Sequence, residues 1–442
     1  MSKLLKFKKS LTASRIIIFG FLFVILTGTL LLMLPISSTN GVSFLDALFT
    51  ATSATCVTGL VVNNTATAWT MFGHFVIMCL IQIGGMGVIT LAILIGIVSG
   101  KKIGITSRSL MQESVSAPYV GGIIRYSKFF VKGIFVIEFI GMILLCFQFI
   151  PDYGVLKGIW YALFHSVSAF CNAGFDIIST PNTPSSLSMY AYNPLINIVI
   201  CLLIIIGGIG FITWRDFQSH KFKFSKYSLQ SKLVLTTTAI LLVAPFLFFF
   251  FHEFKDLTVG QRFWVSMFQS VTLRTAGFNT VDFNGMSEAS RLIMIIMMLI
   301  GGATGSTAGG MKVTTFSIVV LASFAIFFKR HDVSVFKRRI IDEIVLNALA
   351  IFMMYLFLFL TGGIAISVIE NLPILDCLFE SASAVGTVGL SMGITASLSS
   401  ASHIILIILM YLGRVGGLTF IYATVSKVKS YSKLPQEKVT VG

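Results

Sequence analysis

Long apolar runs separated by short polar segments follow one another along almost the whole chain. A membrane helix needs about 20 apolar residues at a rise of about 1.5 Å each. Runs of this kind lie near residues 16–34, 74–98, 129–150, 194–214, 233–251, 290–328, 344–369 and 402–425. The sixth run is too long for one span and is interrupted by glycines. The pattern predicts an all-α polytopic membrane protein with eight spans in pairs, the last of which holds Arg414.

Between the two helices of each pair lies a shorter segment that is half apolar and half Ser, Thr or Gly. Such segments are too short to span a bilayer and too polar to face lipid, so they are predicted to be re-entrant hairpins. They read FTATSATCVTGL (49–60), FHSVSAFCNAGF (164–175), MFQSVTLRTAGF (267–278) and FESASAVGTVGL (379–390). Each has Gly in its eleventh position, and these glycines are separated by 115, 103 and 112 residues. The second helices also repeat, with IGGMG, IGGIG, IGGAT and LGRVG.

The repeating unit is therefore helix, re-entrant hairpin, helix, and it occurs four times. We predict the units at residues 1–100, 101–226, 227–335 and 336–442. Because each unit returns the chain to the side on which it started, all four run parallel. Four parallel hairpins can surround a central pore with pseudo-fourfold symmetry.

Composition and charge support this class and add an orientation. Of the 442 residues 56% are apolar and only 11% are charged, which excludes a soluble or a disordered chain. The net charge of +15 comes from cations in short clusters between the apolar runs, so no nucleic-acid partner is predicted. By the positive-inside rule, the chain is predicted to lie in the plasma membrane with both termini in the cytoplasm. The hairpins then enter from outside.

The hairpin ends are the candidate selectivity filter. Short helices aimed C-terminus first at an axis place partial negative charge there, and glycines let carbonyl oxygens face the axis. Stacked carbonyl rings can replace the hydration shell of a monovalent cation, and K⁺ at these carbonyls is the expected ion. Read singly, each segment could be a Gly-ended turn between packed helices, but four occurrences in register favour a filter. The filter residues are predicted to be Val57, Thr58, Gly59, Asn172, Ala173, Gly174, Thr275, Ala276, Gly277, Thr387, Val388 and Gly389.

A second candidate element is GGATGSTAGGMK, residues 301–312, inside the sixth run. Its backbone cannot face lipid, and its spacing does not fit a phosphate loop. It suits an obstruction below the filter, with too few side chains to be fixed by packing; the alternative is a close crossing of two helices through small residues. Arg414 replaces a glycine of the repeated pattern deep in the last span, where it is either a functional cation or one that reaches the interface or a carboxylate. The gate residues are predicted to be Gly301, Gly302, Gly305, Ser306, Thr307, Gly309, Gly310, Lys312 and Arg414.

Other chemistry finds no support in the sequence. The six cysteines are far apart without a CxxC pair, and the six histidines form no metal-binding motif and are expected to be ordinary polar residues. No set of catalytic side chains is recognisable, so the chain is predicted to be no enzyme and to carry no covalently bound cofactor. Parallel repeats argue against an alternating-access transporter, whose repeats are usually inverted. Glu138, in the middle of the run 129–150, is given no role.

These segments resemble the Trk/Ktr/HKT superfamily of potassium transporters, and most closely the membrane subunit of bacterial Ktr systems. The resemblance extends from LLMLPIS (31–37) through the four hairpins to LGRVGGLTF (412–420). It implies potassium uptake, a homodimer in the bilayer, and a cytosolic ring of regulatory subunits that bind the nucleotide and control opening. It makes the four hairpin glycines the selectivity glycines, residues 301–310 the gate loop, and Arg414 the basic residue beneath the filter.

The resemblance also frames two open points. Some relatives have Ser in place of the first filter glycine and favour sodium, so Gly59 indicates potassium. Dependence on Na⁺ stays open, and the alternative function is a sodium or non-selective monovalent cation channel or symporter of the same architecture. Arg274 and Thr275 are bulkier and more polar than their counterparts, which predicts an asymmetric third wall.

Overall fold

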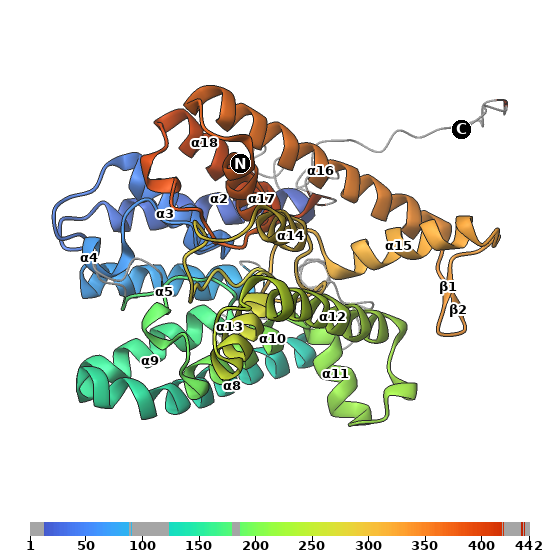
Figure 1. The fold of residues 1–442 in the computed structure, drawn as a ribbon, viewed down its shortest axis with the longest axis horizontal. Coiled ribbons are helices and arrows are strands. Elements are labelled where there is room, and N and C mark those ends of the chain that lie inside the picture. Colours follow the sequence, from blue (N-terminus) through green and yellow to red (C-terminus); the bar gives the residue numbers. More distant parts are fainter. Residues whose placement is uncertain are drawn as a thin grey trace, which may run out of the picture.

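A computed structural model describes residues 13–87, 123–178 and 186–417, with a few isolated positions besides. In that part of the chain the predicted order of elements recurs four times (Figure 1). The long first helices of the four units are α2 (Ala13–Leu32), α8 (Ile123–Tyr153), α12 (Leu229–Phe248, continued by the π-helical turn η3, Phe249–Glu253) and α16 (Asp342–Glu370). The hairpin helices are α3 (Phe44–Cys56), α9 (Val155–Phe170), α13 (Val259–Thr272) and α17 (Ile374–Gly386).

The second helices of the units are shorter and less regular. They are α5 (Met71–Met86), α10 (Pro194–Gly208) with α11 (Phe211–His220), α14 (Glu288–Leu299) with α15 (Val313–Phe327), and α18 (Ser400–Val415). Short elements join them: α4 (Thr65–Ala68), η1 (Ser188–Tyr190), η2 (Phe224–Lys226), η4 (Thr395–Ser397) and the two-stranded hairpin β1 (Ser334–Val335) and β2 (Arg338–Arg339). Four helices of the described part are long and apolar enough to cross a membrane, and they are the first helices of the four units.

The prediction of one continuous span at 194–214 is wrong. The chain turns by 95° between α10 and α11. Gly210 sits at the turn with φ +85°, a conformation that side-chain-bearing residues rarely adopt. The backbone carbonyls of Gly207 and Gly208 accept hydrogen bonds from residues 303–307, so they do not continue the helix. Helix α18 ends at Val415, before Gly416 at φ +86°, so Arg414 lies in its last turn. Most of residues 88–98 and 418–425 of the predicted spans lies outside the described residues.

A repeated polar contact fixes the N-terminal end of the helix that follows each hairpin. The side chain four residues after the helix N-cap donates to a backbone carbonyl of the preceding loop. The bonds are His74 Nε2 to Thr65 (2.8 Å), Asn197 Nδ2 to Tyr190 (3.0 Å), Arg291 Nη2 to Asn284 (2.6 Å) and His403 Nε2 to Thr395 (2.8 Å). Two of the histidines predicted to be ordinary polar residues are therefore buried structural donors. Because His, Asn and Arg occupy the equivalent position in different units, this part of the repeat cannot be recognised from the sequence.

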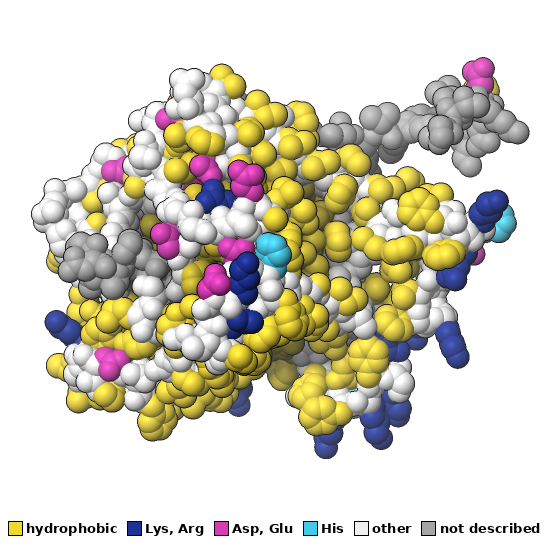
Figure 2. All heavy atoms as spheres, viewed as in Figure 1, with side chains coloured by type: hydrophobic (Ala, Val, Ile, Leu, Met, Phe, Trp, Pro, Cys, Tyr) yellow, Lys and Arg dark blue, Asp and Glu magenta, His cyan; other side chains and the backbone are white. Residues whose placement is uncertain are grey.

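Apolar side chains pack into two large clusters and also cover the outside. One cluster consists mainly of residues from the first two units with a few from the third, and the other mainly of residues from the third and fourth units with a few from the first. Many large apolar side chains are exposed on the long first helices, for example Phe23 and Phe147 at 70% each. Figure 2 shows broad hydrophobic areas over the outer helices. In a polar solvent such surfaces would be unstable, and a lipid bilayer covers them.

Candidate ion pathway

The four hairpin helices end in the same unusual backbone conformation. The residue two positions before each hairpin glycine has positive φ: Val57 (58°), Asn172 (59°), Thr275 (65°) and Thr387 (51°). The glycines follow with φ of 94°, 69°, 79° and 94° for Gly59, Gly174, Gly277 and Gly389. A non-glycine residue at positive φ costs of order 1 kcal/mol or more, and a β-branched one is a true outlier. Four such positions in register are a built feature of the fold.

The four glycines contact one another in a closed order. A Cβ atom built on any of them would lie less than 3.0 Å from the backbone carbonyl oxygen that precedes the glycine of the next unit. The pairs are Gly59 with Ala173, Gly174 with Ala276, Gly277 with Val388, and Gly389 with Thr58. The contacts run from unit one through units two, three and four back to unit one. The glycines thus form a ring in which backbone approaches backbone, and no side chain fits at any of the four positions.

Hydroxyl groups of the hairpin helices brace these segments from behind. Ser53 Oγ and Ser383 Oγ each accept a hydrogen bond of 3.0 Å, from the N–H of Gly59 and of Gly389. In the other two units Ser168 Oγ donates to the carbonyl of Phe175 (2.8 Å) and Thr272 Oγ1 to that of Phe278 (2.6 Å). The sequence shows these serines and the threonine only as polar residues of the hairpins. In the structure their hydrogen bonds fix the path of the extended segments.

The third hairpin end differs from the other three in the side chain of Arg274, whereas its backbone conformation is the same. Thr275 and Gly277 have the same signs of φ as their counterparts in the other units. Arg274 is buried, and its Nη2 lies 3.5 Å from the carbonyl oxygen of Gly301. The guanidinium therefore points toward the glycine-rich loop.

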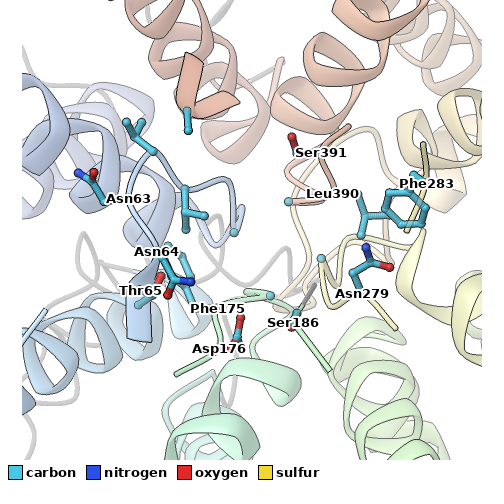
Figure 3. A pocket seen from close by; sticks show the side chains of 17 residues that line it. Asn63, Asn64, Thr65, Phe175, Asp176, Ser186, Asn279, Phe283, Leu390 and Ser391 are labelled. Carbon is cyan, nitrogen blue, oxygen red and sulfur yellow. The ribbon is translucent and has the colours of Figure 1, made fainter. Parts of the chain in front are cut away.

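On one side of the glycine ring lies a vestibule of about 260 Å³. All four ring glycines contribute to its floor, and loop residues from all four units surround it (Figure 3). Asn64, Asp176, Asn279 and Ser391 bring polar groups to its wall. A hydrated ion therefore has room directly beside the ring.

The glycine-rich segment 300–312 lies against the second and fourth units. Ala303 N and Thr307 N donate to the carbonyls of Gly208 (2.8 Å) and Gly207 (3.3 Å), and Gly310 N donates to that of Gly413 (3.2 Å). Thr307 Oγ1 donates to the carbonyl of Phe170, the last residue of α9 (3.0 Å). Gly309 and Gly310 lie so close to residues 386–387 that neither has room for a Cβ. Backbone hydrogen bonds thus tie this loop to both units, so it is less free than the sequence suggested.

Two cations hold the same loop. Arg414 donates through Nη1 to the carbonyl of Thr307 and through Nη2 to that of Gly84, with Gly85 at 3.4 Å. Lys312 Nζ donates to the carbonyls of Ala308 (2.7 Å) and Gly309 (3.4 Å). Neither forms an ion pair with a carboxylate of the described chain. Arg414 thus joins the fourth unit, the loop of the third and α5 of the first.

Glu138, for which no role is predicted from the sequence, lies beside the second hairpin. Its Oε1 accepts a hydrogen bond from Gln82 Nε2 (3.0 Å) and lies 3.8 Å from Cys171 Sγ. Ser166 Oγ of α9 donates to its backbone carbonyl (2.6 Å). Cys171 directly precedes Asn172 at the hairpin end. The position of Glu138 in the middle of an apolar run could have indicated a role, because carboxyl groups within the membrane are rare without a function.

Comparison with known proteins places this geometry in a family. The model of the TrkH family, described as cation transport protein, matches residues 3–434. The chain belongs to this family. The family is one of membrane transporters, which confirms the resemblance seen in the motifs.

Two relatives match over nearly their whole length. The chain is 40% identical to the Ktr system potassium uptake protein B of Bacillus subtilis, covering 98% of this chain and 97% of that protein. It is also 40% identical to the potassium/sodium uptake protein NtpJ of Enterococcus hirae, covering 98% of each.

A solved structure has the same fold. The potassium transporter TrkH from Vibrio parahaemolyticus superposes with a TM-score of 0.68 at 22% identity, over 92% of this chain and 84% of that one. The all-α membrane fold predicted from the apolar runs is confirmed.

Proposed function

We propose that this chain takes up potassium across the plasma membrane through a filter made of backbone carbonyls at the four hairpin ends. The closed ring of Gly59, Gly174, Gly277 and Gly389 is the observation that carries the proposal. A ring without side chains leaves carbonyl oxygens as the groups nearest the axis, and such oxygens can replace the water shell of K⁺. The four units proposed to build it are residues 1–100, 101–226, 227–335 and 336–442.

A carbonyl filter takes monovalent cations in general, so the choice of ion has a second candidate. One relative is named for potassium uptake and another for potassium and sodium uptake. A sodium or mixed pathway of the same architecture is therefore the alternative. Gly59 supports potassium, because the strained segment keeps its shape only without a side chain at this position.

We further propose that residues 301–310 close the pathway beneath the filter. The loop joins α14 to α15, contacts the carbonyls of the second and fourth units, and is bound by Arg414 and Lys312. Two cations beneath a cation filter repel a permeating ion, in addition to the obstruction by the loop itself. Opening requires that backbone hydrogen bonds break together, which suits control by a binding partner.

The proposed assembly is a homodimer in the bilayer, both termini in the cytoplasm, with a cytosolic ring of subunits that binds the regulatory nucleotide. The name of a relative as part of a Ktr system supports a partner of this kind. The chain itself is proposed to act without a cofactor and to catalyse no reaction, with K⁺ as its cargo.

The test is cation flux into liposomes that contain the purified chain, with K⁺, Rb⁺, Cs⁺ and Na⁺ compared at equal concentration. Potassium flux well above sodium flux supports the proposal. Equal fluxes of K⁺ and Na⁺ favour the alternative. No flux of any of these ions from folded protein in the presence of the cytosolic subunit contradicts both.

A further inference from the structure

The vestibule beside the glycine ring contains a second set of equivalent positions. The residue two places after each ring glycine lines it, and the four are Val61, Asp176, Asn279 and Ser391. These residues form an outer ring on top of the glycines. One of them is apolar, two are neutral and polar, and Asp176 carries the charge.

Asp176 is the one carboxylate among the described residues that line the vestibule, and no Lys or Arg is among them. Figure 3 shows it facing the same space as Asn64, Asn279 and Ser391. Glu380 lies behind Ser391, fully buried, where it accepts hydrogen bonds from Ser391, Met392 and Thr395. Glu380 is thus part of the wall, whereas Asp176 faces the entrance.

The size of the vestibule decides which form of the ion it takes. A volume of about 260 Å³ is many times the roughly 10–15 Å³ that a cavity needs to hold one water molecule. A monovalent cation with its first water shell fits in that space. Amide and hydroxyl groups on the other sides can bond to those waters, and the single carboxylate attracts the cation without removing its shell.

We propose that Asp176 and the surrounding polar groups form an external site for a hydrated monovalent cation, which raises the local ion concentration at the filter entrance. A single carboxylate in the wall holds a monovalent ion weakly, so the ion can move on. This inference rests on the proposed function, and it assigns Asp176 to capture of the ion and the glycine ring to discrimination between ions.

The main test is the dependence of K⁺ flux on external K⁺ for wild type and Asp176→Asn in liposomes. Asparagine keeps an oxygen that accepts from the N–H of Ile178, as Asp176 Oδ1 does (3.1 Å), so the local turn is retained. At an ionic strength of about 0.01 M, loss of one nearby charge is expected to raise the half-saturating K⁺ concentration roughly two- to fivefold. The difference should nearly vanish at about 1 M salt, where the screening length is only about 3 Å. The K⁺/Na⁺ flux ratio should not change.

Relocation of the charge provides the matched variant. Asn279 occupies the equivalent position of the third unit, and its Oδ1 accepts from Val281 N (3.1 Å), a bond that an aspartate retains. The double variant Asp176→Asn, Asn279→Asp should restore the wild-type half-saturating concentration. Asp256→Asn removes an exposed carboxylate that does not line the vestibule and should have no effect. Unchanged half-saturation in Asp176→Asn, or equal effects of Asp176→Asn and Asp256→Asn, would overturn the inference while leaving K⁺ transport intact.

A second readout separates this inference from the proposed function. Thermal unfolding of the purified chain is measured at low ionic strength with K⁺ or with choline as the cation. Stabilisation by K⁺ in wild type and in the double variant, but reduced in Asp176→Asn, supports the site even if no flux is detected. Identical stabilisation in all three proteins contradicts it.

Discussion

At each hairpin end two residues have positive φ, and only the glycine of each pair could be predicted from the sequence. The four glycines at the hairpin ends could be predicted because their spacing repeats and glycine alone fits there. The residues at positive φ two positions earlier could not, because Val57 and Thr387 are β-branched and normally avoid that region. Their conformation follows from the hydroxyl bonds behind them and from the neighbouring units, which no local pattern reports. For the same reason the sequence missed the link between Glu138 and the second hairpin.

A side chain at Gly59 should reduce discrimination between potassium and sodium. In Gly59→Ser the new Cβ would lie under 3.0 Å from the carbonyl oxygen of Ala173, and the residue would be held at φ +94°. Strain of about 1–3 kcal/mol must then be relieved by moving the carbonyls. We expect the K⁺/Na⁺ flux ratio to fall roughly tenfold, the effect of about 1.4 kcal/mol.

The control is Gly393→Ser, which places a serine at φ +88° with nothing within 4 Å of its Cβ. It introduces similar backbone strain outside the ring and should leave the flux ratio unchanged. A ratio in Gly59→Ser equal to that of wild type would contradict the proposed filter.

Removal of the carboxyl at Glu138 should destabilise the packing around the second hairpin. Glu138→Leu leaves the half-buried amide of Gln82 without its acceptor, which costs up to about 1–3 kcal/mol. Glu138→Gln retains an oxygen at that place and should unfold closer to wild type. The measurement is equilibrium unfolding in mixed detergent, and a leucine variant as stable as wild type would show that this contact contributes little.

At the level of elements, periodicity predicts type better than it predicts where a helix stops. The paired runs and the hairpins were found because apolar length and repeat spacing are local properties. The 95° turn between α10 and α11 was not, because the backbone groups that end α10 bond to residues about a hundred positions later in the chain. The interruption of the sixth run was visible, since five glycines within 301–310 cannot form a stable helix.

Weakening the loop should increase transport. Arg414→Ala removes the hydrogen bonds to the carbonyls of Thr307 and Gly84 and a positive charge from the pathway. Hydrogen bonds from charged groups contribute about 1.5–3 kcal/mol, so the closed state should lose a large share of its advantage. We expect K⁺ flux to rise roughly tenfold and to depend less on the cytosolic subunit, with the K⁺/Na⁺ ratio retained. Deletion of several residues within 303–308 should act in the same direction.

Arg414→Lys is the matched variant, because it keeps the charge but cannot bond to both carbonyls at once. An intermediate flux is expected if hydrogen bonds and charge both contribute. Flux is measured on monodisperse protein in liposomes, so that misfolded variants are excluded. Folded Arg414→Ala with flux equal to or below wild type would contradict the gate.

For the whole molecule, charge is distributed between opposite sides. Figure 2 shows most of the visible Lys and Arg side chains gathered near α11 and the β1–β2 hairpin, while the Asp and Glu side chains lie mainly on the other side. Two cationic segments meet there. The ring of Phe224 lies 6.1 Å from that of Phe336, and Lys232 Nζ lies about 6 Å from both. This aromatic packing joins the two segments into one surface, which we define by Lys223, Lys226, Lys337 and Arg338.

We expect this cationic surface to bind the proposed cytosolic nucleotide-binding subunit. All four of its side chains are exposed, whereas the neighbouring Arg339 is already paired with Asp332 (3.1 Å) and Asp342 (3.0 Å). Reversal of the four charges to Glu should lower recovery of the subunit in pull-down roughly tenfold, since exposed charge pairs contribute about 0.2–1 kcal/mol each. Exposed charges are screened beyond about 8–10 Å at ordinary ionic strength. Added salt should therefore weaken the wild-type complex and reduce the difference in recovery between wild type and the charge-reversed variant. The control reverses Lys157 and Lys255, which are exposed on the opposite side and should leave binding unchanged. Recovery that is indifferent to the four reversals and to salt would place the docking surface elsewhere.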